Sequence, residues 1–251
     1  MSLALVLSGG AARGAFHLGI LHFIEENNIQ IDAYSGSSIG SIISASHASG
    51  VNAKEQLKIF SSKEVKKVLK FNYFKNGLIK IDTNHPILND LLPISRLEDI
   101  PKKVFINAYD IKQKKLHYFD KGDTHTLCIA SSALIPLFKP ISYEKKYLID
   151  GGLIDNLPIR PFLDTNHQIC SIDLMPRKQH TVKKRVFNPI KMAKRKLFSH
   201  WIDNVNYSIK HSDYYITNQK ILNFKMFTFK ELNECFNLGY KEAQKHFLDI
   251  L

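Results

Sequence analysis

The segment Gly36-Ser37-Ser38-Ile39-Gly40 fits the pattern G-x-S-x-G. This pattern places a serine on a tight turn between a strand and a helix, and the two glycines relieve the crowding of that turn. The setting matches, because an apolar stretch at 31–34 precedes the turn and a helical pattern at 38–49 follows it. The start of a helix also favours a developing negative charge. The pattern predicts Ser38 as a nucleophile for acyl transfer, and a Gly/Ser-rich turn without function is the alternative.

A second turn of small residues, Gly9-Gly10-Ala11-Ala12-Arg13-Gly14, follows the apolar run at 3–7. Small residues at the start of a helix leave backbone N–H groups open to an anion, and Arg13 adds positive charge. One interpretation is an oxyanion hole that serves Ser38, formed by Gly9, Gly10 and Ala11 together with Arg13. Such donors stabilise the charge that develops on the carbonyl oxygen during acyl transfer.

The same turn has a competing interpretation as a dinucleotide-binding fingerprint. Gly9, Ala11 and Gly14 occupy the three glycine positions of G-x-G-x-x-G, and Asp32 lies near the offset of about 20 residues expected for a ribose-binding acid. However, Ala11 replaces the second glycine, and Asp32 runs directly into the G-x-S-x-G turn. A phosphate-binding P-loop is excluded because no G-K-[ST] follows.

A third element, Asp150-Gly151-Gly152, ends a short strand expected at 147–149. An aspartate in this position can present its carboxylate to a cleft. By itself the pattern is that of a turn, but beside the other two motifs it makes Asp150 a candidate base for Ser38. A Ser-His-Asp triad would instead need a histidine after the acid. Five histidines qualify by order only, and none has a recognisable catalytic context: His167, His180, His200, His211 and His246.

Together the three motifs resemble the patatin-like phospholipase family. The flanks resemble it as well, in the run from Ala130 through Pro136 to Phe138 and in the stretch 152–158. The resemblance implies a Ser38–Asp150 dyad without histidine, a glycine-rich oxyanion loop, and hydrolysis of (lyso)phospholipids or related acyl esters. It implies no cofactor, and the absence of H-E-x-x-H and of a calcium loop predicts no metal requirement. The family usually has glycine where this chain has Ala11, so the resemblance does not settle the oxyanion donors.

The order of elements predicts the fold class. Strands at 3–7 and 31–34 alternate with helices at 14–27 and 38–49, which indicates a βαβα unit with a parallel sheet. We expect one domain over residues 1–251, a three-layer α/β/α arrangement around a mostly parallel sheet. The motif-bearing core is expected at about 3–175, and the segment 177–251 adds a basic stretch and C-terminal helices. The remaining expected elements are helices at 53–60, 63–70, 84–92, 124–132 and 191–210 and strands at 104–110, 116–119, 147–149 and 169–174.

Charge is concentrated in one segment of this chain of net charge +12. Arg177–Leu197 holds nine basic residues and no acidic one, with apolar residues between them. We expect this segment to attract an anionic membrane, or to be a solvated loop. A nucleic-acid-binding protein is a rival interpretation, but it has no use for the serine turn, so no nucleic acid is expected. The three cysteines are unpaired in pattern, and the N-terminus has no basic region before its short apolar run. Both favour the cytoplasm, where the basic segment would allow peripheral binding at the inner membrane face.

Overall fold

A computed structural model describes residues 2–64, 86–135, 137–176 and 204–247. Within these residues the strands form an eight-stranded sheet in the order β5-β6-β3-β2-β1-β7-β8, with β4 paired to β3 off this path. The pairs β3–β2, β2–β1, β1–β7 and β7–β8 are parallel, whereas the pairs at the β3–β6 end are antiparallel. The strands are β1 (Leu3–Leu7), β2 (Ala33–Gly36), β3 (Lys103–Asp110), β4 (Lys115–Phe119), β5 (Ile141–Tyr143), β6 (Lys146–Asp150), β7 (Gln168–Ile172) and β8 (Tyr214–Ile216).

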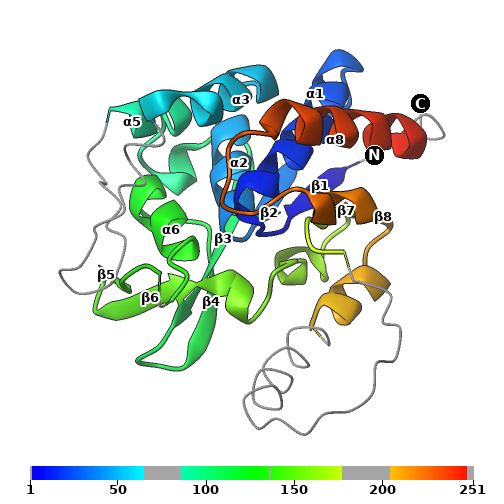
Figure 1. The fold of residues 1–251 in the computed structure, drawn as a ribbon. Coiled ribbons are helices and arrows are strands. Elements are labelled where there is room, and N and C mark those ends of the chain that lie inside the picture. The colour runs from blue at the N-terminus through cyan, green and yellow to red at the C-terminus, as the bar shows by residue number, and fades with distance from the viewer. Residues whose placement is uncertain (1, 65–85, 136, 177–203, 248–251) are drawn as a thin grey trace, which may run out of the picture.

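Helices cover both faces of this sheet, so the predicted three-layer α/β/α fold with a mostly parallel sheet is confirmed (Figure 1). The central strand β1 shows the two faces, because its side chains alternate between two separate cores. Leu5 and Leu7 pack in the larger core with the helices that follow β1 and β2. Ala4 and Val6 pack in the smaller core, against the segment around Phe162. Burial on both faces explains why this strand is apolar throughout.

The helices follow the expected pattern closely where the structure describes them. The helices are α1 (Ala15–Glu26), α2 (Ile39–Ala48), α3 (Ala53–Ser61), α5 (Ile87–Leu91), α6 (Thr124–Ser131) and α8 (Leu232–Phe247). A 3-10 turn, η1 (Ala11–Gly14), leads into α1, and further 3-10 turns are η2 (Leu97–Asp99), η3 (Gly151–Leu153), η4 (Arg160–Phe162) and η5 (Gln219–Asn223). Residues 204–210 are also helical. The helix expected at 63–70 and most of that expected at 191–210 lie outside the described residues.

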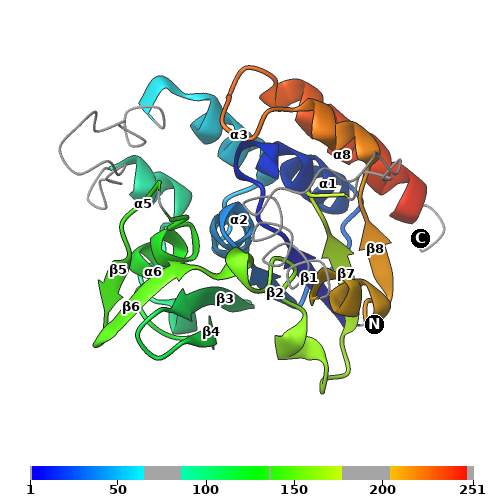
Figure 2. The same ribbon diagram turned by 60° about the horizontal axis from the view of Figure 1, so that its bottom comes forward.

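The C-terminal helix α8 lies along α1 in both views (Figures 1 and 2). The two helices meet through facing glycines. A Cβ atom on Gly19 would come 1.9 Å from the carbonyl oxygen of Phe236, and one on Gly239 would come 2.1 Å from that of Phe16. Nearly every residue of α1 from Ala15 to Ile24 is buried, on the side away from the sheet as well as on the side toward it. The reason is that α8 covers the face of α1 that the sheet does not.

Two further features concern the surroundings of the protein. Cys128, Cys170 and Cys235 are free and buried, so none is placed to form a disulfide within the chain. None of the helices in the described portion combines the length and the apolar character needed to cross a bilayer.

The close contact of α1 with α8 makes Gly19 intolerant of even a methyl group. We expect Gly19→Ala to lower the free energy of unfolding by about 2–3 kcal/mol, because the helices must separate, although alanine is the better helix former. The matched control is Asn237→Ala on the exposed side of α8, which should change stability little. Urea denaturation measures both, and an unchanged midpoint for Gly19→Ala would contradict the packing described here.

Candidate active site

Ser38 occupies a strained turn between β2 and α2. Its backbone angles are φ 51° and ψ −124°, a conformation that costs a non-glycine residue about 1–3 kcal/mol. The turn is tight enough that a Cβ on Gly36 would lie 2.4 Å from the carbonyl oxygen of Gly40. A Cβ on Gly40 would lie 2.1 Å from that of Leu7, at the end of β1. The strand-to-helix turn predicted from G-x-S-x-G is therefore present, and both glycines are needed for it.

Asp150 is the last residue of β6, which runs antiparallel to β3 and places Asp150 opposite Ala108. Its side chain is buried, with 6% of the residue exposed. Its Oδ1 accepts a hydrogen bond of 2.7 Å from the N–H of Gly152, and the nearby Ser38 side chain lowers the pKa of the carboxyl group. The fold thus joins the two residues that the sequence singled out.

Burial raises the pKa of Asp150 to about 7, against the opposing effect of its hydrogen bonds from Gly152 and Ser38. The cause is desolvation, because a carboxylate loses its hydration on entering the protein and the neutral acid does not. A carboxyl group with this pKa is a far better proton acceptor at neutral pH than an ordinary aspartate. The arrangement can therefore accept the proton of the Ser38 hydroxyl.

Gly9, at the end of β1, lies against Ser38. A Cβ on Gly9 would come 3.0 Å from the Cβ of Ser38 and 2.7 Å from Oδ1 of Asn156. The Gly9 N–H donates to Asn156 Oδ1 at 3.1 Å, and Asn156 Nδ2 donates to the Gly9 carbonyl at 3.3 Å. This pair of bonds occupies the Gly9 amide, so Gly9 positions the loop while its N–H is already in use.

Three other backbone amides, in the glycine-rich loop and in the serine turn, are open. In residues 2–64, 86–135, 137–176 and 204–247, no hydrogen-bond acceptor faces the N–H of Gly10, Ala11 or Ile39. Gly10 and Ala11 belong to the predicted oxyanion loop, whereas Ile39 follows the nucleophile at the start of α2. Ala11 has a φ of 52°, so the alanine adopts the left-handed conformation that a glycine would take without strain.

The Arg13 side chain is directed toward the C-terminal part of the chain. Its Nε donates to the Phe224 carbonyl at 2.9 Å, and its Nη1 and Nη2 donate to those of Leu174 and Leu222, each at 3.4 Å. The sequence predicted Arg13 as part of the oxyanion hole. In the structure its guanidinium is engaged with these three carbonyls.

A second set of polar side chains supports the turn, and the sequence analysis did not single these residues out. The Ser38 N–H donates to Ser131 Oγ at 2.9 Å, and Ser131 Oγ lies 3.5 Å from Asn107 Oδ1. Asn107 Nδ2 in turn donates to the Asp155 carbonyl at 2.6 Å. Ser131 and Asn156 lie within the two flanking segments that carry the family resemblance, so that signal was available. Asn107 lies in the middle of β3, outside the three motifs and their flanks.

Comparison with known proteins identifies the family to which this site belongs. Residues 5–163 match the patatin-like phospholipase family. The chain belongs to that family. The earlier resemblance is confirmed, and the match covers all three motifs, the serine turn, the glycine-rich loop and the aspartate turn.

Relatives with names extend this finding. The chain is 32% identical over 166 residues to lysophospholipase NTE1 of Debaryomyces hansenii, covering 63% of this chain and 11% of that protein. It therefore spans about a tenth of the length of this relative. Among solved structures, VipD of Legionella pneumophila superposes with a TM-score of 0.64 at 14% identity, covering 98% of this chain and 67% of that one. The type III effector ExoU of Pseudomonas aeruginosa gives 0.50 at 14% identity, covering 99% and 53%. These two likenesses show the patatin-like fold.

Histidines take no part in this patatin-like site within the described residues, where neither Ser38 nor Asp150 hydrogen-bonds to one. His17 is the nearest in sequence to the loop. It is fully buried, its Nε2 lies 2.9 Å from the Ser8 carbonyl, and burial lowers its pKa to about 4. Its Nε2 therefore carries the proton and donates to the Ser8 carbonyl just before the loop, which is a structural role. His180 and His200 lie outside the described residues.

The dinucleotide alternative for this patatin-like chain finds no support in the geometry. A ribose-binding acid must lie at the carboxyl end of the second strand, on the same edge as the glycine turn. Asp32 precedes β2, which is parallel to β1, so it lies at the opposite edge. There its Oδ2 accepts a 2.9 Å hydrogen bond from the N–H of Leu3.

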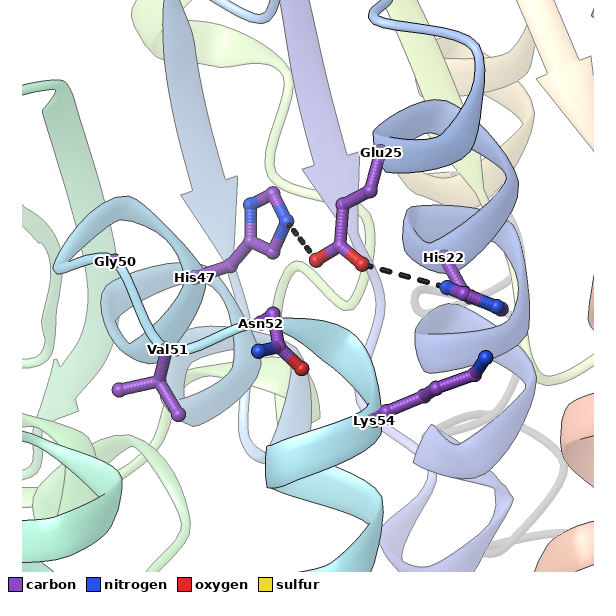
Figure 3. A pocket seen from close by; sticks show the side chains of 7 residues that line it. All are labelled: His22, Glu25, His47, Gly50, Val51, Asn52 and Lys54. Atoms are coloured by element: carbon purple, nitrogen blue, oxygen red, sulfur yellow. Dashed lines mark hydrogen bonds and ion pairs between the residues drawn. The ribbon is translucent and has the colours of Figure 1, made fainter.

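The patatin-like domain has a pocket elsewhere, at the far ends of α1 and α2 (Figure 3). Glu25 lies at its centre and is already satisfied, since Oε1 accepts from His47 Nε2 at 2.9 Å and from the Ala53 N–H at 2.8 Å. His22 lies 3.5 Å from the other oxygen. These groups join three helices to one another. Across the described ranges, no group of three or more His, Cys, Asp or Glu side chains could hold a metal ion.

Because folding buries the Asp150 carboxyl, it makes stability depend on pH. With a pKa raised from 3.8 to about 7, the buried carboxyl does not lower the free energy of unfolding below pH 3.8. The destabilisation builds up between pH 3.8 and about 7 and is complete above that. The full penalty is about 4 kcal/mol, at about 1.36 kcal/mol per unit. Asp150→Asn should therefore increase the free energy of unfolding at pH 8 by up to this amount and at pH 5 by much less.

The control for this prediction is Asp164→Asn, which changes an exposed aspartate and should have little effect at either pH. Denaturant titrations at pH 5 and pH 8 give the comparison. If Asp150→Asn increased the free energy of unfolding equally at both pH values, ionisation of the buried carboxyl would not be the cause of the increase.

Proposed function

We propose that this protein hydrolyses acyl esters of lipids, such as (lyso)phospholipids, with Ser38 as nucleophile and Asp150 as its base. The observation that carries the proposal is that the Ser38 side chain acts on a buried carboxyl whose pKa is raised to about 7, so the hydroxyl lies beside its proton acceptor. Membership of a phospholipase family supports the substrate class. The name lysophospholipase borne by a relative supports it further.

The reaction has two stages. Asp150 accepts the hydroxyl proton while Ser38 Oγ attacks the ester carbonyl, and the alcohol leaves with that proton. A water molecule then attacks the acyl-enzyme, Asp150 accepts its proton, and Ser38 is restored as the fatty acid leaves. The strained turn presents the Ser38 hydroxyl to the substrate, with the Asp150 carboxyl beside it.

The negative charge that develops on the carbonyl oxygen needs donors that are otherwise free. The N–H groups of Gly10, Ala11 and Ile39 meet this requirement within the described residues, and those of Gly10 and Ala11 belong to the predicted loop. The amide after the nucleophile is a common second donor in serine hydrolases with a similar turn. Gly9 and Arg13 contribute to this oxyanion hole indirectly, because they hold the loop that carries its donors in place.

The catalytic prediction concerns the dyad. Ser38→Ala and Asp150→Asn should each lower kcat for a p-nitrophenyl acyl ester by at least about 10³-fold, because alanine cannot attack and an amide cannot accept the proton. The double variant should be little worse than either, since the two act as one unit. Ser37→Ala is the matched control and should keep its activity. The rate of the wild type should fall about tenfold per pH unit below about 7, where Asp150 becomes protonated.

A histidine triad makes the opposite prediction. One of the eleven histidines would then be indispensable, and the aspartate would only orient it. Steady-state hydrolysis by the eleven single His→Gln variants decides between the two. A folded histidine variant without activity, beside an active Asp150→Asn, would overturn the dyad.

We further propose that the basic segment 177–197, which lies outside the described residues, binds anionic membrane at the cytoplasmic face. Its nine basic residues support this, at roughly 1 kcal/mol for each one near the surface. Neutralising six of them should weaken binding to phosphatidylserine vesicles more than it lowers turnover of a soluble ester. Vesicle sedimentation measures the binding and ester hydrolysis measures the turnover. An equal loss of vesicle binding and of turnover would show that the segment has a structural role. The six are Lys183, Lys184, Arg185, Lys194, Arg195 and Lys196.

A further inference from the structure

Residues 222–226, here called the C-terminal strap, lie beyond the family match at 5–163 and contact the glycine-rich loop. Three alternate carbonyls of the strap accept hydrogen bonds from the loop. Those of Leu222 and Phe224 accept from the Arg13 guanidinium, and that of Met226 accepts from the Ala12 N–H at 2.8 Å. Leu222 lies in the last turn of η5, and Phe224 follows it with extended backbone angles. The three carbonyls of the strap thus meet donors of the same loop.

Arg13 is buried, with 8% of the residue exposed, and no carboxylate pairs with it in the described residues. A buried guanidinium needs acceptors for its donors, and here carbonyls from two separate parts of the chain supply them. Leu174 follows β7, while Leu222 and Phe224 belong to the strap. The planar fork of arginine can reach several acceptors at once, which the single ammonium group of lysine cannot do in the same geometry.

This connection bears on the open amides beside Ser38. Arg13 and Gly10 belong to one turn, since the Arg13 N–H donates to the Gly10 carbonyl at 3.2 Å. Ala11 between them is held at a φ of 52°, a conformation that persists only when its surroundings enforce it. The C-terminal helix adds a contact, because Cys235 Sγ lies 3.6 Å from the Arg13 carbonyl. One end of the turn is thus tied to the C-terminal part of the chain.

We propose that Arg13 is a positioning residue which anchors the oxyanion loop to the C-terminal strap, so that residues outside the family match determine where the Gly10 and Ala11 amides lie. This rests on the function proposed above. The positive charge of Arg13 acts through the loop that it holds and makes no direct contact with the substrate. The strap is accordingly part of the catalytic unit of this protein.

The first test compares Arg13→Lys with Arg13→Gln in hydrolysis of a p-nitrophenyl ester. Both should lower kcat about 10²-fold, the size expected for a displaced oxyanion donor, and leave KM nearly unchanged. Guanidinium ion added to Arg13→Gly should restore part of kcat, because it can occupy the vacated acceptors. Arg96→Lys, at an exposed arginine that pairs with Glu98, is the matched control and should stay at the wild-type rate. If the Arg13→Lys variant retained more than half of the wild-type kcat, positive charge alone would suffice and the proposal would be overturned.

The second test addresses the strap itself and remains decisive if the Arg13 variants fold poorly. Replacing Lys225 by its α-hydroxy acid turns the Phe224–Lys225 amide into an ester, and an ester carbonyl is a weaker acceptor. This change should lower kcat about tenfold in the wild type and hardly at all in Arg13→Gln, because coupled changes do not add. A wild type unaffected by the ester, or an equal loss in both backgrounds, would overturn the proposal. Ser38→Ala in the same assay separates the two claims, since its activity would refute the proposed function instead.

Discussion

The structure around the candidate site depends on the approach of two backbones at Gly40. The turn after β2 must begin a helix within two residues of Ser38, and to do so it passes within van der Waals contact of the end of β1. No side chain fits between the Gly40 Cα and the Leu7 carbonyl. Because β1 and β2 are parallel neighbours, the same approach brings the glycine-rich loop that follows β1 alongside Ser38. The position of the loop is thus a consequence of the turn.

A second constraint is the burial of the Asp150 carboxyl. The antiparallel pairing of β6 with β3 delivers this group to the edge where the parallel strands end, and the surrounding core withholds water from it. The protein is less stable with a charged carboxylate in that position than with a neutral group. The same desolvation brings its pKa to about 7, which suits a base. Stability and the proposed chemistry are opposed at this residue, as is common where a group must be both buried and reactive.

The loop beside Ser38 is held from several directions by side chains that never touch the nucleophile. Asn156 bonds both polar atoms of the Gly9 backbone, and His17 donates to the carbonyl of Ser8. Arg13 connects the far end of the loop to the strap. An amide aligned before the substrate arrives needs no reorganisation during the reaction. This redundancy offsets the strain at Ala11 and Ser38, two non-glycine residues with positive φ.

The sequence alone predicted the elements whose signals are local. The G-x-S-x-G turn, the small-residue turn and the Asp-Gly-Gly turn each consist of residues adjacent in the sequence. Ser38, Asp150 and the first two βα units could therefore be predicted without coordinates. Three features were decided only by the tertiary structure. The residue pattern of α1 could not show that α8 covers its outer face, because α8 lies some two hundred residues further along the chain. The availability of each loop amide depends on whether Asn156 reaches it. The direction of the Arg13 side chain depends on carbonyls at 174, 222 and 224, and a backbone carbonyl leaves no mark in a sequence, since every residue carries one.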